Sequence, residues 1–409
     1  MVKVFTNISY LVNARLHSVL LRGNQLAVLP VIKNAYLIIE DGIIAEYGEM
    51  KNLKKNISNT EEVSGAILPC WCDSHTHIVF AGSREDELID RIKGLSYGDI
   101  SAKGGGILNS AKCLIQASED NLFNQAWMRL EELGRLGTGA IEIKSGYGLS
   151  AQGELKMLRV IKKLKEKSSL FIKSTFLAAH AYPAEYTKNH KGYIDVIVNE
   201  MLPVIAHEKL ADYIDVFCET GFFSPEETET ICRAGMQYGL KPKLHVNQLN
   251  SIGGIETGIK LKAISLDHLE VMNDDEIMKL ANSGIIGTLL PTAAFFLNMQ
   301  LPPARKLIDA GAAVVLASDY NPGSSPGGNM NFVVALSCIQ MKMLPEEAIN
   351  AATINGACAM ELQNETGSIT IGKKANLIFT KPIPSLAYLP YSFATNLIDR
   401  VMLNGEFIM

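Results

Sequence analysis

The middle of the chain carries short, unbroken apolar runs, each ending in a polar residue and followed by a longer amphipathic stretch. There are eight runs, at residues 67–72, 138–143, 171–178, 214–218, 243–246, 263–266, 285–289 and 313–318. The intervening segments, such as 150–167 and 274–284, repeat apolar residues at helical spacing. Apolar strands that alternate with helices indicate a parallel sheet covered on both faces. Eight such units favour a (β/α)8 TIM-like barrel. A doubly wound open sheet is the alternative, disfavoured because no GxGxxG follows the first strand.

The two ends of the chain have a different pattern. Segment 36–48 has β-branched runs around Asp41-Gly42, and segment 399–409 has runs around Asn404-Gly405. Asp-Gly and Asn-Gly predict tight hairpins, and segment 367–380 adds two short strands. We therefore expect a small β-sandwich domain built from both chain ends, with two unrelated hairpins as the alternative. The expected division of the chain is 1–66 and 361–409 for this domain and 67–360 for the barrel.

Composition narrows the classes of partner. The chain has 409 residues, 47% of them hydrophobic and 20% charged, and a net charge of −5. No block of Lys and Arg suggests a nucleic-acid or membrane-surface partner. No run reaches the roughly 18 apolar residues of a membrane span. The seven cysteines include no CxxC pair, which is typical of a reducing compartment. These features predict a cytoplasmic protein that binds neither nucleic acid nor membrane.

Polar side chains follow the predicted barrel strands at their carboxyl ends, where active sites of such barrels lie. They are His75 and His77, Lys144 and Tyr147, His180, Glu219, His245, His268 and Asp319. A lone histidine at a strand end is more often a hydrogen-bonded core residue than a ligand. Five of the chain's eight histidines on one rim instead favour a site.

The spacing of two histidines points to a metal. His75 and His77, at i and i+2, share one face of a strand. His245 and Asp319 complete a set of three nitrogens and one oxygen, which borderline divalent metals favour. The sequence therefore predicts a metal site at the mouth of the barrel.

The ordered set of these residues resembles the amidohydrolase superfamily. That family has an HxH on strand 1, histidines after strands 5 and 6, and an aspartate after strand 8. Finer motifs, among them "HTHIVFAGSREDEL", "IEIKSGYGLS" and "ASDYNPGSSP", resemble one member that hydrolyses a C–N bond of a small cyclic amide in histidine degradation. The resemblance covers nearly the whole chain. Another cyclic-amide hydrolase or a deaminase of this superfamily is the alternative, and a non-catalytic scaffold is a third.

The resemblance implies one divalent metal per subunit, zinc or iron, held by His75, His77, His245 and Asp319. Relatives with two metals carry a bridging lysine after strand 4, where this chain has Glu219. Lys144 follows strand 2 instead, and we interpret it as supporting or structural. A homodimer is also implied.

The expected chemistry is attack by a metal-activated water. Asp319 is the candidate group that takes a proton from this water and passes it to the leaving nitrogen. His268 is the candidate for polarising the ring carbonyl or orienting the water, or alternatively a partner of Asp319. Proton transfer is thus assigned to Asp319 or His268.

The resemblance also implies a small anionic substrate whose carboxylate is bound by Arg84. A neutral base would not need such a cation, although an arginine within "SREDE" is otherwise a common surface ion pair. Further candidate substrate-binding residues are Tyr97, Tyr147, His180, Gln248, Asn321, Gly323 and Ser324. Some relatives have glutamate at the position of Gln248, and an amide cannot act as a base. Asn321 to Ser324 also reads as a plain turn. The glycines 104–106 are either a loop over the site or a flexible connection.

Overall fold

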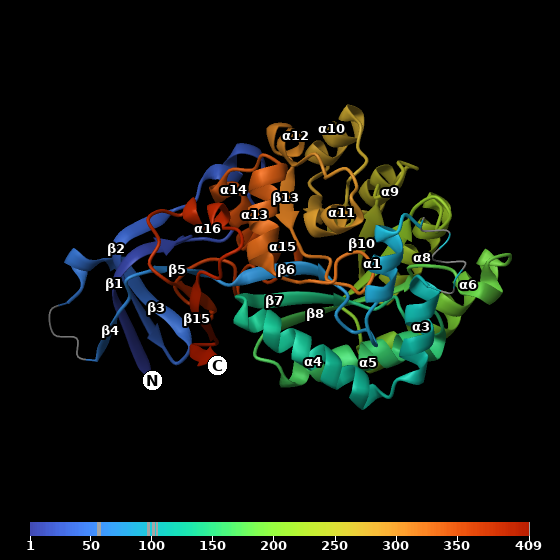
Figure 1. The fold of residues 1–409 in the computed structure, drawn as a ribbon, viewed down its shortest axis with the longest axis horizontal. Coiled ribbons are helices and arrows are strands. Elements are labelled where there is room, and N and C mark those ends of the chain that lie inside the picture. The colour runs from blue at the N-terminus through green and yellow to red at the C-terminus, as the bar shows by residue number, and fades with distance from the viewer. Residues whose placement is uncertain (55–58, 96–98, 100–102, 104, 409) are drawn as a thin grey trace.

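The computed structural model describes residues 1–408 apart from 55–58, 96–98, 100–102 and 104. Figure 1 shows a large barrel domain and, beside it, a smaller β-domain that contains both termini. The expected fold is confirmed.

Eight parallel strands form the barrel sheet in sequence order. They are β6 (Trp71–Thr76), β7 (Thr138–Lys144), β8 (Phe171–Ala179), β9 (Tyr213–Cys218), β10 (Lys241–Val246), β11 (Ser265–His268), β12 (Ile286–Leu289) and β13 (Ala313–Leu316). The sheet closes where the segment after β13 returns to β6. There Asp319 N donates to His75 O at 3.0 Å, and His77 N donates to Tyr320 O at 2.9 Å. This closure excludes the open-sheet alternative.

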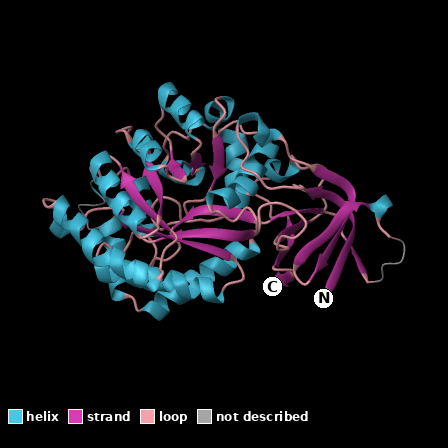
Figure 2. Ribbon diagram, turned by 180° about the vertical axis from the view of Figure 1, so that it is seen from behind, coloured by secondary structure: helices cyan, strands magenta, loops and turns pink. Residues whose placement is uncertain are grey.

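Helices surround the barrel strands (Figure 2). They are α1 (Glu85–Ile92), α3 (Ile107–Gln116), α4 (Glu119–Arg135), α5 (Ala151–Lys167), α6 (His190–Val196), α7 (Leu202–Glu208), α8 (Pro225–Gln237), α9 (Gly254–Leu261), α10 (Asp274–Ser283), α11 (Pro291–Leu297), α12 (Ala304–Asp309), α13 (Met330–Gln340), α14 (Pro345–Ala352), α15 (Ile354–Ala359) and α16 (Tyr388–Tyr391). The 3-10 segments η1 (Gly23–Ala27), η2 (Met50–Asn52) and η3 (Ala184–Tyr186) and the π-helical turn η4 (Ile197–Met201) complete the described helices.

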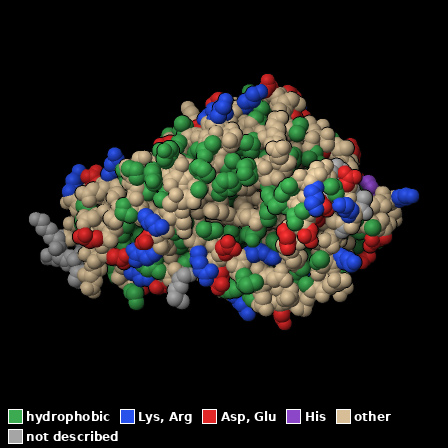
Figure 3. Space-filling model, viewed as in Figure 1, with side chains coloured by type: hydrophobic (Ala, Val, Ile, Leu, Met, Phe, Trp, Pro, Cys, Tyr) green, Lys and Arg blue, Asp and Glu red, His purple; other side chains and the backbone are tan. Residues whose placement is uncertain are grey.

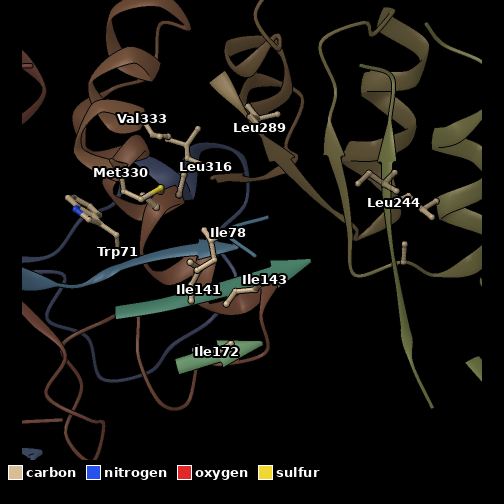
Figure 4. Close-up of a cluster of buried hydrophobic side chains, with 14 of the residues drawn as sticks. Trp71, Ile78, Ile141, Ile143, Ile172, Leu244, Leu289, Leu316, Met330 and Val333 are labelled. Atoms are coloured by element: carbon tan, nitrogen blue, oxygen red, sulfur yellow. The ribbon is translucent and has the colours of Figure 1, made fainter. Parts of the chain in front are cut away.

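Successive side chains along each barrel strand point to opposite faces of the sheet. The outer face, toward the helices, is apolar, and the inner face is polar. Ile141 and Ile143 of β7 belong to the buried cluster between strands and helices in Figure 4, which also includes Leu244 of β10. Their neighbours Glu142 and Lys144 on β7 have no exposed surface, and a strand directs them to the opposite face. The barrel interior is therefore charged at the level just beneath its mouth.

The small domain is one mixed sheet of eight strands. They are β1 (Val2–Val12), β2 (Val31–Glu40), β3 (Ile43–Glu49), β4 (Thr60–Glu62), β5 (Ala66–Pro69), β14 (Leu377–Thr380), β15 (Ile398–Leu403) and β16 (Glu406–Ile408). The Asp41-Gly42 and Asn404-Gly405 turns have positive φ at both residues, as type I′ hairpins require. The sheet curls, so that Phe407 of β16 lies 6.1 Å from Phe5 of β1 between ring centroids. Its halves thus face each other as in a sandwich.

The first apolar run divides between the two domains. Residues 67–69 lie in β5, which pairs with β14 and β1 of the small sheet, and the barrel begins at Trp71 of β6. The prediction of one strand over 67–72 is therefore corrected to two strands, and the switch between sheets falls at Cys70. Both strands are fully buried, so the hydrophobic pattern carries no sign of the change.

The surface is mixed in character. Figure 3 shows hydrophobic side chains gathered over the middle of one face, where Figure 1 places α13 and α16, and charged side chains around its margins. None of the helices in the described ranges is long and apolar enough to cross a membrane.

Candidate active site and metal centre

Three histidines converge at the mouth of the barrel. Ligand atoms of His75, His77 and His245 lie within 4.8 Å of one another, and all three side chains are buried. His75 Nε2 faces His77 Nε2 at 3.4 Å. His75 Nδ1 lies 2.7 Å from Asp267 Oδ2. A ring that donates from Nδ1 carries no proton on Nε2, so His75 presents a lone pair to the centre.

The nitrogen atoms of His245 fit a metal ligand. Its Nδ1 lies 2.9 Å from Asp215 Oδ2 without forming a hydrogen bond, and both ring nitrogens are buried without a hydrogen-bond partner. Burial lowers the pKa of His245, and likewise the pKa values of His75 and His77, well below the ordinary range. Three neutral imidazoles, of which His245 has buried nitrogens without a hydrogen-bond partner, suit a divalent cation.

Asp319 brings the carboxylate to the same centre. Its Oδ1 lies 3.5 Å from His75 Nε2 and 3.6 Å from His77 Nε2. Asp319 has a φ of +53°, in the left-handed region, and the residue before it is tied to β6, because Asp73 Oδ1 accepts a hydrogen bond from Ser318 N at 3.0 Å. Burial raises the pKa of the Asp319 carboxyl to about 6. The structure thus brings together the four residues predicted to hold a metal.

The side chain of His268 points toward the same mouth of the barrel because its backbone departs from strand conformation. Its φ is +86° and that of Leu269 is +69°, a rare conformation for residues with a side chain. Its ring lies 5.3 Å from the ring of His245, between centroids. Burial opposes protonation, but Glu270 and Asp319 outweigh it and raise the pKa of His268. His268 is therefore placed to carry a proton beside Asp319.

A small cavity of about 50 Å³ lies at the centre of these groups. Among the described residues it is lined by His77, Tyr147, His180, Phe217, His245, Gln248, His268, Asp319, Asn321 and Ser324. Five of the residues predicted to bind substrate are thus in the lining. His180 stacks on His77 with ring centroids 5.4 Å apart, and burial lowers the pKa of His180 to about 4. Tyr97 lies outside the described residues.

Arg84 lies at the edge of the site in an ion pair. Its Nε and Nη2 donate to the two carboxylate oxygens of Glu87 at 2.8 and 2.6 Å. Glu87 also accepts a hydrogen bond from Gly106 N at 2.8 Å. A Cβ placed on Gly323 would lie 2.2 Å from Arg84 Nη1. The structure therefore shows the ion pair within "SREDE" and, at the same time, contact between Arg84 and the predicted substrate loop.

The loop after Asp319 is held by the side chain of Asn321. Asn321 Oδ1 accepts hydrogen bonds from Gly323 N and Ser324 N, both at 2.8 Å. Asn321 Nδ2 donates to Asp319 O at 2.7 Å, and Ser324 Oγ donates to Asp319 Oδ2 at 3.3 Å. Residues 321–324 therefore form a turn that is also part of the site, and Asn321 orients this loop around Asp319.

Sequence reasoning did not single out the buried charges beneath the histidines. They are Glu142, Asp215, Lys243 and Asp267. Each is a charged residue within or directly beside an apolar run that was expected to be fully buried. Charge at such a position, combined with the period of two along a strand, is the signal that identifies them.

The barrel and its histidine-lined mouth define the class of the amidohydrolases. The model of the amidohydrolase family matches residues 209–408. Guanine deaminase of E. coli shares this fold, with a TM-score of 0.73 at 13% identity, over 100% of this chain and 99% of that one.

The curated relatives are much closer in sequence. The chain is 56% identical to imidazolonepropionase of Flavobacterium johnsoniae and 54% identical to imidazolonepropionase of Christiangramia forsetii, each over 100% of both chains. The chain therefore belongs to the imidazolonepropionase family of amidohydrolases.

Proposed function

We propose that the protein hydrolyses 4-imidazolone-5-propanoate to N-formimidoyl-L-glutamate in histidine degradation. The observation that carries the proposal is the convergence of His75, His77, His245 and Asp319 in a chain that aligns end to end with imidazolonepropionases. Hydrolysis breaks the bond between the ring carbonyl carbon and its nitrogen. It needs a nucleophile, polarisation of the carbonyl and a proton for the leaving nitrogen.

One divalent metal, zinc or iron, fits the four residues, since three imidazole nitrogens and one carboxylate suit either ion. The unpartnered His245 Nε2 supports this. When bound, such an ion supplies hydroxide at neutral pH by lowering the pKa of water from about 16 toward about 7.

The protein's own groups then move the proton and polarise the ring. Asp319 accepts a proton from the attacking water and returns it to the leaving nitrogen. His268 donates a hydrogen bond to the ring carbonyl, a role supported by its raised pKa and its place in the lining. Gln248 contributes a hydrogen bond and no proton.

The propionate tail of the substrate is assigned to Arg84. Its guanidinium is positively charged and rigid, and Glu87 fixes its orientation at the loop that contains Gly323. Tyr147 and His180 form the wall of the cavity on which the ring rests. Tyr97 stays a candidate for the same wall.

We further propose that the protein acts in the cytoplasm as a homodimer, on a small anionic substrate and without a nucleic-acid or membrane partner. The seven cysteines, all free, support the location. The solvent-exposed aromatic rings of Phe295 and Phe393, each 58% exposed, support association. Light scattering of the purified protein tests the homodimer, with twice the chain mass expected.

The assignment of the metal site is tested with His75→Ala. We expect this variant to lose both bound metal and turnover, because a ligand nitrogen is removed. His17→Ala changes an exposed histidine and should keep both. Turnover by His75→Ala at the rate of the unaltered protein would contradict the assignment.

A further inference from the structure

We propose that Lys144 is a positioning residue for the metal centre: its ammonium group holds Asp215 and Asp267, which in turn aim His245 and His75 at the metal. The inference rests on the proposed function only through the metal site.

Lys144 lies directly beneath the histidines. Its Nζ is 2.7 Å from Asp215 Oδ2, 2.7 Å from Glu142 Oε1 and 3.4 Å from Asp267 Oδ2, and none of these four side chains has exposed surface. Lys144, Asp215 and Asp267 come from the second, fourth and sixth barrel strands. Alternate strands of such barrels supply one layer of side chains, which explains how three residues distant in sequence meet.

Each of the two aspartates contacts one histidine with the same oxygen that faces Lys144. Asp267 Oδ2 lies 2.7 Å from His75 Nδ1, and Asp215 Oδ2 lies 2.9 Å from His245 Nδ1. The other oxygens are also engaged, because Asp267 Oδ1 accepts from Ser265 Oγ at 2.6 Å and Asp215 Oδ1 accepts from His245 N at 3.1 Å. Each carboxylate is thereby fixed in one orientation.

Lys144 holds the two carboxylates where they face the histidines. The ionised carboxylate of Asp267 only accepts, so His75 Nδ1 carries the proton and His75 Nε2 stays a ligand. Asp215 stays close to His245 Nδ1 and so limits how the ring of His245 can turn. Among the described contacts, Lys144 is the lysine or arginine that pairs with Asp215 and with Asp267. Without its ammonium group, neither carboxylate would be held by a cation against the histidine that it faces.

The ion-paired group beneath the histidines carries a net negative charge. It contains the cations Lys144 and Lys243 and the carboxylates of Glu142, Asp215 and Asp267, so one negative charge is left over. A negative group at this position favours a cation above it.

Lys243 offers a matched control. It is equally buried, and it pairs with Glu142 and lies 4.8 Å from the centre of the Tyr213 ring. No ion pair joins Lys243 to Asp215 or Asp267 among the contacts of the described residues. If buried positive charge had a purely structural role, replacing either lysine would affect metal binding to a similar extent. If Lys144 positions the ligands, only its replacement should weaken metal binding.

The experiment measures Co²⁺ binding to the metal-free protein, by competition with a chromophoric chelator and by the visible spectrum of the bound ion. We expect K144M to bind Co²⁺ on the order of 10–100 times more weakly than the unaltered protein, as for other residues that support ligands, with an altered spectrum. K243M should weaken binding by less than about tenfold, below the range found for residues that support ligands. Thermal melting of both metal-free variants reports the structural cost separately.

A second variant separates positioning from charge balance. K144M/E142Q removes one cation and one carboxylate and so keeps the net charge of the buried group, and it also serves where K144M alone is unfolded. We expect it to bind Co²⁺ as weakly as K144M. Tight binding by either Lys144 variant, or equal weakening in K144M and K243M, would overturn the proposal. Failure of the unaltered protein to bind Co²⁺ would instead count against the proposed function.

Discussion

Asp267 Oδ2 and His75 Nδ1 lie 2.7 Å apart with neither side chain exposed. This contact fixes which nitrogen of His75 faces Asp319 and His77. Its strength comes from burial, because an ion pair or hydrogen bond in a low-dielectric interior is weakened little by solvent. The geometry of the metal centre therefore depends on residues that touch neither metal nor substrate.

Asp267→Asn tests this dependence directly. The amide keeps the size of the side chain but removes the charge that holds the Nδ1 proton of His75. We expect metal affinity to fall on the order of 10–100-fold, measured by dialysis against metal buffers. Asp309→Asn, which changes a carboxylate that is 66% exposed, should leave the affinity unchanged. Unaltered affinity in Asp267→Asn would show that His75 keeps its orientation without the carboxylate.

Arg84→Ala tests the assignment of the substrate's carboxylate. Charge-assisted hydrogen bonds contribute about 1.5–3 kcal/mol, so KM should rise by about 10–100-fold, with metal content unchanged. Steady-state kinetics and metal analysis of one sample give both quantities. Arg159→Ala is the control, because Arg159 makes a similar two-pronged pair with Glu208 between α5 and α7. Loss of metal with an unchanged KM would place Arg84 in a different role.

Gly323→Ala should act through Arg84. The added methyl group would lie 2.2 Å from Arg84 Nη1, well inside van der Waals contact distance, so the guanidinium has to shift. We expect KM to rise while the melting temperature changes little, because the shifted atoms end a side chain. Gly327→Ala, where a Cβ meets no atom within 4 Å, should change neither. Equal KM values in the two variants would contradict the close contact between Gly323 and Arg84.

Metal affinity should depend only weakly on mild acidification. Protons compete with the metal for its ligands, so affinity falls as pH falls through the pKa of each ligand. Burial lowers the pKa values of His75, His77 and His245 well below 6.5 and raises the pKa of Asp319 to about 6.

Among the four proposed ligands, only Asp319 therefore binds a competing proton between pH 7.5 and 5.5. The apparent Kd should rise about fourfold over this range, which is the effect of one group with a pKa of about 6. Three histidines with ordinary pKa values would instead weaken binding by about a thousandfold. A titration of Co²⁺ at both pH values distinguishes the two.

The sequence predicted the barrel and the convergence of His75, His77, His245 and Asp319 at its mouth, because both depend on local signals. Unbroken apolar runs mark buried parallel strands, and a histidine after such a run falls on the rim. The orientation of His268 could not be predicted, since its left-handed φ of +86° breaks the strand period. Nor could the Arg84–Glu87 pair be distinguished from a surface one, because burial of these two side chains depends on Gly106 and on the loop at Gly323, which are distant in sequence.

The same limit explains the division of segment 67–72. Where the chain passes from the small sheet to the barrel, the strands that pair with it change but its burial does not. The hydrophobic pattern of a sequence reflects burial alone, so it does not reveal this change of partners. Glu142 and Lys243 are the opposite case. Their charges within buried strands were visible in the sequence, but their partners come from other strands and appear only when the barrel closes.

The most direct test of the account is to add the metal-loaded protein to freshly made 4-imidazolone-5-propanoate and follow the ultraviolet absorbance of its ring. We predict that the absorbance is lost with formation of N-formimidoyl-L-glutamate, that chelation stops the reaction, and that added zinc or iron restores it. A stable absorbance in the presence of fully metal-loaded, folded protein would contradict the account.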